Sequence, residues 1–290
     1  MSNKPINFAF FGTPDVASQT LEILKQKGLM PSLIITSPDR PQGRKMLITP
    51  PPVKVWADKN NVSFLQPENL KELEGILKNS SEKNDITDMF GLEQAFNYDL
   101  FIVVAYGKIF PEWLINKPKY GTINIHYSLL PKYRGASPVQ SAILNDDTET
   151  GVTIQKMVKE LDAGDIIAQE KIEINADERT PELLNRLIET GGELLAKILP
   201  DYIDGKIKSK IQDKKEITLC KKIKKEDGLI DLDNNPEENY NKFRAYVIWP
   251  RTYFIKNGKR NIITDAELKN GKFTIKKIIP ENGKETNYSV

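Results

Sequence analysis

Apolar and polar positions along the first two hundred residues predict strands and helices in turn. Residues 6–11 form a continuous apolar run, which indicates a strand buried on both faces. A helix is predicted next, with Thr13 as its N-cap, Pro14 at its first helical position and Gly28 at its end. Further helices are predicted at 53–59 and 181–203, and further strands at 33–36, 62–65, 100–104, 121–126, 151–157 and 166–174. This order favours an α/β fold with a Rossmann-like, mainly parallel sheet and helices on both faces.

The pattern changes beyond residue 225. A helix is predicted at 236–247, followed by strands at 252–255, 261–264 and 272–279, with turns at Asn257-Gly258 and Asn270-Gly271. These elements predict a small β-barrel-like (OB-like) domain. We therefore expect a catalytic domain at 1–204, a linker at 205–225 and a C-terminal domain at 226–290.

Two segments interrupt the α/β pattern. Residues 37–53 are rich in Pro and Arg, and four prolines after Arg40 predict an irregular loop, which at this length is usually functional. Residues 71–98 are polar, and we expect a helix, a surface insertion around 79–90 and a second short helix there. The first strand is not followed by a complete G-x-G-x-x-G fingerprint, so a bound dinucleotide is not supported.

The net charge of +2 conceals an asymmetry between the two parts of the chain. Residues 201–290 hold 20 Lys+Arg and 14 Asp+Glu, a net charge of +6, which leaves −4 for residues 1–200. The segment 206–225 alone has nine lysines against Asp213 and Glu216. This segment is either a solvated linker or a surface that contacts phosphates, and its charge by itself does not decide between them.

The rare residue types narrow the possible chemistry. One cysteine, Cys220, excludes a disulfide framework within the chain, and with only one histidine we expect no metal site. No apolar run approaches the length of a membrane span, and residues 1–5 are too short for a signal peptide. A cytoplasmic protein is expected.

The single histidine, His126, is the strongest candidate for proton chemistry. It ends the predicted strand 121–126, where Asn124 shares its face because residues two apart on a strand point the same way. This pairing at a strand end favours a polar site over a structural histidine. The turn Leu161-Asp-Ala-Gly-Asp165 adds Asp162, which is either a plain turn residue or a carboxylate that orients His126.

The order of these segments resembles the methionyl-tRNA formyltransferases, within the folate-dependent formyltransferase superfamily, over nearly the whole chain. The matching segments are Phe11-Gly-Thr-Pro-Asp15, Pro38-Asp-Arg-Pro-Gln-Gly-Arg44, Pro52-Val-Lys54, Val103-Val-Ala-Tyr-Gly107, Asn124-Ile-His-Tyr-Ser-Leu-Leu-Pro131, Tyr133-Arg-Gly-Ala-Ser-Pro-Val-Gln140, Glu149-Thr-Gly-Val-Thr153 and Leu161-Asp-Ala-Gly-Asp165. Any one of these motifs is weak evidence, but their number and order make the resemblance specific.

The resemblance implies formyl transfer from 10-formyltetrahydrofolate, a co-substrate, to the amino group of methionine on initiator tRNA, a step of translation initiation. The catalytic Asn, His and Asp of the family correspond to Asn124, His126 and Asp162. The folate-contacting positions correspond to Tyr106, Gly107, Ser128, Leu129, Leu130 and Pro131. Contacts to tRNA are expected at Arg44, Lys206, Lys208 and Lys210. No metal or covalent enzyme intermediate is implied, and we expect a monomer.

Other functions are compatible with parts of this pattern. An N-formyltransferase for an amino-sugar nucleotide would keep the same three catalytic residues, but the proline-rich loop and the basic segment argue against it. A hydrolase that releases formate from the folate would need neither of those features. A tRNA-binding or folate-binding protein without turnover is discouraged by the intact Asn124, His126 and Asp162. Ser128 suggests a serine hydrolase, but the G-x-S-x-G elbow is absent.

Overall fold

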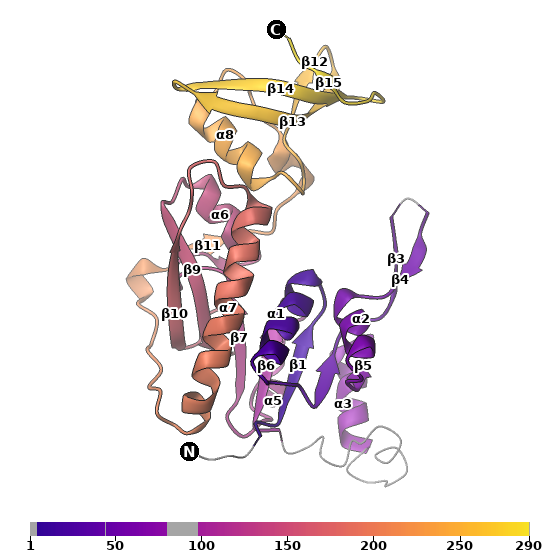
Figure 1. Cartoon of the computed structure of the whole chain (residues 1–290), viewed down its shortest axis with the longest axis vertical. Helices are drawn as coiled ribbons and strands as arrows, with labels where there is room; N and C mark the ends of the chain where they lie inside the picture. Colours follow the sequence, from indigo (N-terminus) through magenta and orange to yellow (C-terminus); the bar gives the residue numbers. More distant parts are fainter. Residues whose placement is uncertain (1–4, 44, 80–97, 290) are drawn as a thin grey trace. The chain divides into compact units, whose positions relative to one another are not determined.

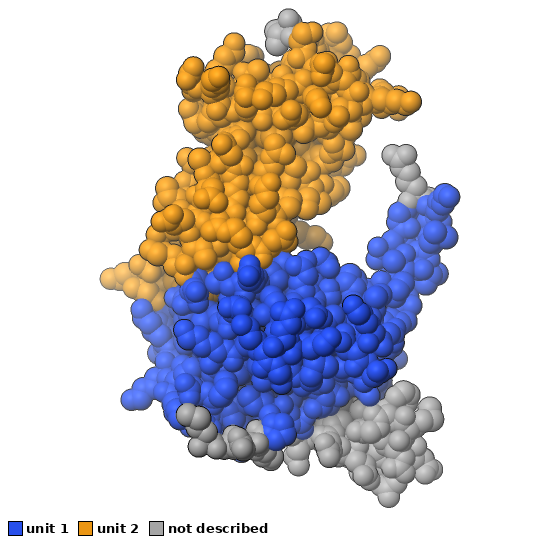
Figure 2. Space-filling model, viewed as in Figure 1, with its two compact units in different colours: residues 1–126, 153–170, 188–212 blue, residues 127–152, 171–187, 213–290 orange. Residues whose placement is uncertain are grey.

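The computed structural model describes residues 5–43, 45–79 and 98–289 (Figure 1). The chain divides into two compact units, each assembled from separate segments (Figure 2). Unit 1 contains residues 1–126, 153–170 and 188–212, and unit 2 contains residues 127–152, 171–187 and 213–290. Because the units interleave along the sequence, the linear division at residues 204 and 225 stays a prediction.

A seven-stranded sheet has the strand order β10-β9-β7-β6-β1-β2-β5. Strands β1, β2, β5, β6 and β7 run parallel to one another, and β9 pairs antiparallel with β7. The strands are β1 (Phe8–Gly12), β2 (Leu33–Ile35), β5 (Phe64–Leu65), β6 (Leu100–Val104), β7 (Thr122–His126), β9 (Glu149–Lys156) and β10 (Ile166–Glu173). The predicted mainly parallel α/β sheet is confirmed.

Helices cover both faces of this sheet, as the uninterrupted apolar runs of β1 and β6 predicted. All five residues of each of these strands are buried. Ala9 and Phe11 face a core that also contains residues of α3 (Leu70–Asn79) and α5 (Glu112–Ile115). Helix α1 (Asp15–Gln26) approaches the opposite face, where a side chain at Gly12 would lie 2.6 Å from Ala17 Cβ. Helix α7 (Thr180–Ile203) packs beside α1, since a Cβ at Gly192 would lie 2.9 Å from the side chain of Ile23.

The start of α1 differs by one position from the sequence prediction. The helix begins at Asp15, and Pro14 is its N-cap, with an extended ψ of 178°. Thr13 therefore lies before the cap, and its hydroxyl is 3.1 Å from the hydroxyl of Ser37. The predicted helix end is confirmed, because Gly28 adopts the left-handed conformation that stops a helix.

The proline-rich segment 37–53 is more regular than predicted. It contains a two-stranded antiparallel hairpin, β3 (Arg40–Gln42) and β4 (Leu47–Thr49), which projects from the sheet in Figure 1. The expectation of an irregular loop was wrong, because Pro41 needs no N–H on the open edge of a two-stranded ribbon. Helix α2 (Pro52–Lys59) follows as predicted, with its proline in the first turn. The insertion and second helix expected before residue 98 fall on residues 80–97, outside the described residues.

The C-terminal part of unit 2 is an antiparallel four-stranded sheet with one helix. Its elements are α8 (Pro236–Ala245), β12 (Tyr253–Lys256), β13 (Lys259–Lys269), β14 (Lys272–Pro280) and β15 (Thr286–Asn287). Phe243 of the helix packs with Phe254 and Ile263 of the sheet. Both predicted turns are confirmed, because Asn257-Gly258 and Asn270-Gly271 have positive φ angles, as tight hairpins require.

The lysine-rich segment is partly ordered rather than a free linker. It contains the short helical turn η2 (Lys214–Glu216) and the strand β11 (Leu219–Cys220), and a second short turn, η3 (Lys225–Gly228), begins at its last residue. Strand β11 pairs in parallel with β8 (Arg134–Gly135), just before helix α6 (Pro138–Leu144). A side chain at Gly135 would lie 2.2 Å from the carbonyl oxygen of Cys220, so only glycine permits this pairing.

Candidate functional site

Asn124 and His126 lie on β7 and share one face of the sheet, as predicted from their spacing. The intervening Ile125 points to the other face and is buried. The Nδ2 atom of Asn124 donates a hydrogen bond to the carbonyl oxygen of Val103 on β6, at 3.0 Å. His126 is only 6% exposed, so its imidazole lies largely out of bulk water. Strand pairing thus fixes the backbone of both residues at the carboxyl end of β7.

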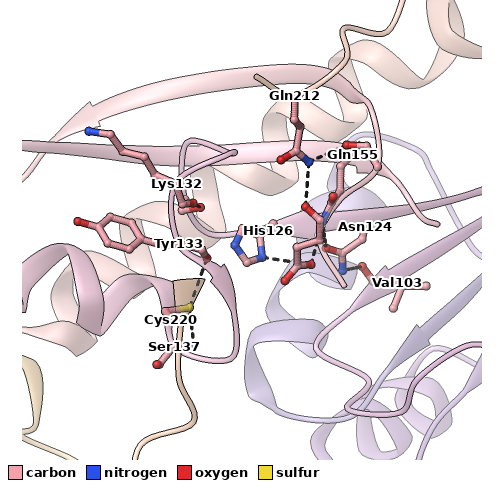
Figure 3. Close-up of polar contacts among 12 residues, drawn as sticks. Val103, Asn124, His126, Lys132, Tyr133, Ser137, Gln155, Gln212 and Cys220 are labelled. Carbon is pink, nitrogen blue, oxygen red and sulfur yellow. Dashed lines mark hydrogen bonds and ion pairs between the residues drawn. The ribbon is translucent and has the colours of Figure 1, made fainter. Parts of the chain in front are cut away.

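Asp162 lies beside His126, from the loop between β9 and β10. Its Oδ1 atom is 3.6 Å from Nδ1 of His126 (Figure 3). The side chain of Asp162 is 12% exposed and that of His126 is 7% exposed, so their electrostatic interaction is only weakly screened by solvent. The backbone of Asp162 has φ of +51°, a conformation that is strained for a non-glycine residue. The fold therefore brings together the three side chains singled out in the sequence.

Gln155 of β9 is a fourth member of this cluster, and the sequence reading missed it. It is 2% exposed and lies directly opposite Asn124 in the β7–β9 pairing. Its Nε2 atom donates to Oδ1 of Asp162 at 2.9 Å and to Oδ1 of Asn124 at 3.3 Å. The strand Glu149–Lys156 contains several polar residues, so no local pattern set Gln155 apart. Its partners also depend on the strand register, which the sequence does not specify.

Gln212 holds the backbone of the Asp162 loop and was also missed. Its Nε2 atom donates to the carbonyl oxygens of Asp162, at 2.8 Å, and of Gly164, at 2.7 Å (Figure 3). A side chain at Gly164 would lie 1.7 Å from the carbonyl oxygen of Lys156, so this loop needs glycine there. Gln212 is 5% exposed although it lies in the lysine-rich segment 206–225, and no sequence signal marked it.

Tyr106 and Gly107 follow β6 at the same sheet edge. The ring of Tyr106 is buried and packs edge-on against Phe11 and Phe110, with centroids 5.5 and 5.8 Å away. Burial raises the pKa of Tyr106 to about 12. Gly107 is exposed and has a positive φ, and apart from its two chain neighbours no described residue has an atom within 4 Å of the position that a Cβ would take. Of the two residues, Gly107 is the one with open space beside it for a ligand.

Ser128, Leu129, Leu130 and Pro131 follow His126 directly along the chain and belong to unit 2. The hydroxyl of Ser128 donates to the carbonyl oxygen of Lys132 at 2.6 Å, so it holds the loop together. At the end of this segment, the carbonyl oxygen of Pro131 accepts a hydrogen bond from the N–H of Thr218 at 3.3 Å. The folate contacts expected in this segment remain a prediction.

The lysines expected to contact tRNA differ in their surroundings. Lys206 forms ion pairs of 2.9 Å with both Asp201 and Asp204, and hydrogen bonds to these carboxylates raise its pKa. Lys208 and Lys210 are exposed. Arg44, the fourth expected contact, lies outside the described residues. Among the three lysines, Lys206 is thus already ion-paired, and Lys208 and Lys210 are the better candidates for phosphate contacts.

The β3–β4 hairpin is anchored at its base by a polar cluster that the sequence did not predict. The carboxylate of Asp39 accepts hydrogen bonds from Gln66 Nε2 at 2.8 Å and from Lys54 Nζ at 3.0 and 2.7 Å. The hydrogen bonds from Gln66 and Lys54 lower the pKa of Asp39. Farther along the hairpin, Leu47 and Ile48 are exposed.

Among residues 5–43, 45–79 and 98–289, no three His, Cys, Asp or Glu side chains gather as metal ligands would. Within the same described ranges, no helix combines the length and apolar character needed to span a membrane.

Two family models match the chain. The model described as formyl transferase matches residues 6–199, and the model described as formyl transferase, C-terminal domain, matches residues 222–287. A methionyl-tRNA formyltransferase of Sulfurihydrogenibium sp. is 41% identical over 89% of this chain and 79% of its own length. One from Halalkalibacterium halodurans is 40% identical over 90% of this chain and 78% of its own.

Solved structures show the same fold at lower sequence identity. An N-formyltransferase from Helicobacter canadensis, in complex with folinic acid and dTDP-3-aminofucose, has a TM-score of 0.64 at 19% identity. That match covers 91% of this chain and 88% of the other. A methionyl-tRNA formyltransferase from Clostridium thermocellum has a TM-score of 0.59 at 15% identity, covering 95% of this chain and all of its own. From the family models and the curated relatives, the chain belongs to the formyl transferase family.

Proposed function

We propose that this protein transfers the formyl group of 10-formyltetrahydrofolate to the amino group of methionyl initiator tRNA. The observation that carries the proposal is the cluster of Asn124, His126 and Asp162 at the carboxyl end of β7, in a chain about 40% identical to methionyl-tRNA formyltransferases. An amide donor, an imidazole and a carboxylate in one partly buried site are suited to acyl transfer, in which negative charge develops on an oxygen.

Asn124 and His126 are the donors that would stabilise this charge. The amino group of the methionine attacks the formyl carbon, and the carbonyl oxygen becomes an oxyanion in a tetrahedral intermediate. One N–H of Asn124 is used by Val103, which leaves the second N–H for the oxyanion. A protonated His126 supplies another donor. Donors placed in this way typically lower a barrier by ~3–4 kcal/mol each.

Asp162 has two roles, one through its contact with His126 and one in proton transfer. Its carboxylate lies 3.6 Å from Nδ1 of the imidazole and so orients the ring toward the oxyanion. The attacking amine must lose a proton, and Asp162 can accept it through a water molecule. As the intermediate collapses, the bond between the formyl carbon and the folate nitrogen breaks, and that nitrogen takes up a proton.

The acceptor is proposed from sequence similarity and charge. The fold alone does not choose between tRNA and an amino-sugar nucleotide, because solved structures of both types of enzyme share it. The curated relatives at 40–41% identity are methionyl-tRNA formyltransferases. We therefore assign tRNA contacts to Arg44, Lys206, Lys208 and Lys210, and folate contacts to Tyr106, Gly107 and residues 128–131. We also propose a cytoplasmic monomer.

A parallel assay of two acceptors tests the proposal. The protein is given 10-formyltetrahydrofolate with either methionyl initiator tRNA or a dTDP-amino-sugar, and the formylated product is measured. Formylation of the tRNA alone is the expected result. Formylation of the sugar alone would keep the catalytic cluster but overturn the tRNA assignment. Release of formate without either product would indicate a hydrolase.

A further inference from the structure

Gln155 occupies a position between two of the proposed catalytic side chains. Its Nε2 atom is 2.9 Å from Oδ1 of Asp162 and 3.3 Å from Oδ1 of Asn124. The two acceptors come from different places in the fold, β7 and the loop after β9. The side-chain amide of Gln155 therefore links Asn124, which would donate to the oxyanion, with Asp162, which lies beside His126.

The chemistry of the acceptors fixes the orientation of both amides. An ionised Asp162 only accepts hydrogen bonds, so Gln155 must turn its NH₂ group toward it. The same NH₂ group then faces Asn124, which must present its oxygen to Gln155. The Nδ2 atom of Asn124 is consequently directed away from Gln155, with one N–H on the carbonyl oxygen of Val103 and the other available.

The oxygen of the Gln155 amide is less well satisfied than its NH₂ group. Its Oε1 atom is buried and accepts no hydrogen bond from the part of the chain that the structure describes. A buried acceptor without a donor destabilises a fold, and an apolar side chain of similar length would remove this penalty. The contribution of Gln155 is therefore better explained by the orientation of its neighbours than by stability.

We propose that Gln155 is a positioning residue for formyl transfer, which sets the amide orientation of Asn124 and the place of the Asp162 carboxylate. The inference rests on the proposed function, in which those two residues act on the transferred group. Gln155 acts through them and itself touches no reacting atom.

The substitution Gln155→Met separates this role from a structural one. The variant removes both hydrogen bonds and the buried acceptor while keeping the length of the side chain. We expect kcat to fall about ten- to hundredfold, because misplaced donors lose much of their effect. The KM values for tRNA and for 10-formyltetrahydrofolate should stay unchanged, and the Tm should be equal or higher.

Gln169→Met is the matched control. Gln169 lies on the neighbouring strand β10 and donates to Oγ1 of Thr153 at 2.9 Å, so the control removes a glutamine side-chain hydrogen bond that involves neither Asn124 nor Asp162. It should keep wild-type kcat. A kcat for Gln155→Met within twofold of wild type would overturn the proposal, as would a loss of kcat matched by Gln169→Met.

A second variant keeps the proposal testable if Gln155→Met folds poorly. Gln155→Glu has the same shape but carries at most one O–H donor, so it cannot donate to Asp162 and Asn124 together. It should show the same loss of kcat with unchanged KM values, and retention of full kcat would contradict the positioning role.

A double-mutant cycle distinguishes failure of this inference from failure of the proposed function. If Gln155 acts through Asn124, then Gln155→Met should reduce kcat much less in an Asn124→Ala background than in the wild type. Equal losses in both backgrounds would overturn the proposal. If the single variants Asn124→Ala and Asp162→Asn each keep full activity, the proposed catalytic roles are refuted instead.

Discussion

Nδ1 of His126 lies 3.6 Å from Oδ1 of Asp162, a separation longer than a good hydrogen bond but within the range of an ion pair. The imidazole comes from a strand that is hydrogen-bonded on both sides, whereas the carboxylate comes from a loop with a left-handed backbone. The histidine is thus the more firmly placed of the two residues, and the position of Asp162 depends on what holds its loop. In enzymes such contacts often shorten when substrate binds.

His126→Ala should abolish formyl transfer while the protein stays folded. The imidazole lies at a strand end, and its loss removes a donor to the oxyanion, worth roughly 10²–10³ in rate. Initial rates with methionyl-tRNA and circular dichroism of the variant check this. Wild-type turnover in the folded variant would refute the mechanism.

Gln212→Leu should reduce both stability and activity. The change leaves the carbonyl oxygens of Asp162 and Gly164 without the donor that they now share, which should lower the free energy of unfolding by about 1–3 kcal/mol. Because the Asp162 loop is then less well held, kcat should fall more than KM rises. Urea unfolding and steady-state kinetics measure the two effects.

Gln19→Leu is the control for that prediction. Gln19 also donates to an oxygen, Oδ2 of Asp15, but this contact is exposed. The control should change the free energy of unfolding by no more than about 0.5 kcal/mol and leave kcat intact. Equal behaviour of the two variants would show that Gln212 has no special role.

Charge reversal in the basic segment should weaken tRNA use in a graded way. Lys208→Glu and Lys210→Glu should raise the KM for tRNA and reduce its salt dependence, because each removes an exposed cation from the proposed phosphate contacts. Lys206→Glu should have a smaller effect, since Lys206 is already paired with Asp201 and Asp204. Lys25→Glu, on the surface of α1, serves as the control. An unchanged salt slope in all variants would identify the segment as a linker only.

Asp39→Asn should loosen the β3–β4 hairpin at neutral pH. Hydrogen bonds from Gln66 and Lys54 hold the pKa of Asp39 below 3.8, so the stabilisation is complete above pH 3.8 and is lost only as the pH falls through the lower, folded-state pKa. The variant reproduces that low-pH state at pH 7, where the wild type should show no pH dependence from this group. We expect faster amide hydrogen exchange over residues 40–49 and a raised KM for tRNA.

The control for the hairpin is Asp58→Asn, which removes an exposed carboxylate from α2. It should leave hydrogen exchange in the hairpin unchanged, and the KM for folate should stay constant in both variants. If Asp39→Asn exchanges as slowly as the wild type, the ion pair does not anchor the hairpin.

Much of the fold was readable from the sequence because it depends on local patterns. The apolar runs at 6–11 and 100–104 predicted buried strands of a parallel sheet, and both were found. Asn257-Gly258 and Asn270-Gly271 predicted hairpin turns because their backbone angles are a local preference. The prolines of 37–53 misled the prediction, because only Pro41 lies in the hairpin, on an open edge that accepts it, and Pro50 to Pro52 follow the second strand.

The sequence by itself determined the alternation of strands and helices, the shared face of Asn124 and His126, and, by resemblance, the family of the chain. Only the tertiary structure decided which side chains complete the site. The β7–β9 register places Gln155 opposite Asn124, and the path of residues 205–212 brings Gln212 to the Asp162 loop. Periodicity along the chain reports which way a side chain points, whereas contacts between distant segments depend on strand register and loop path, which no local pattern encodes.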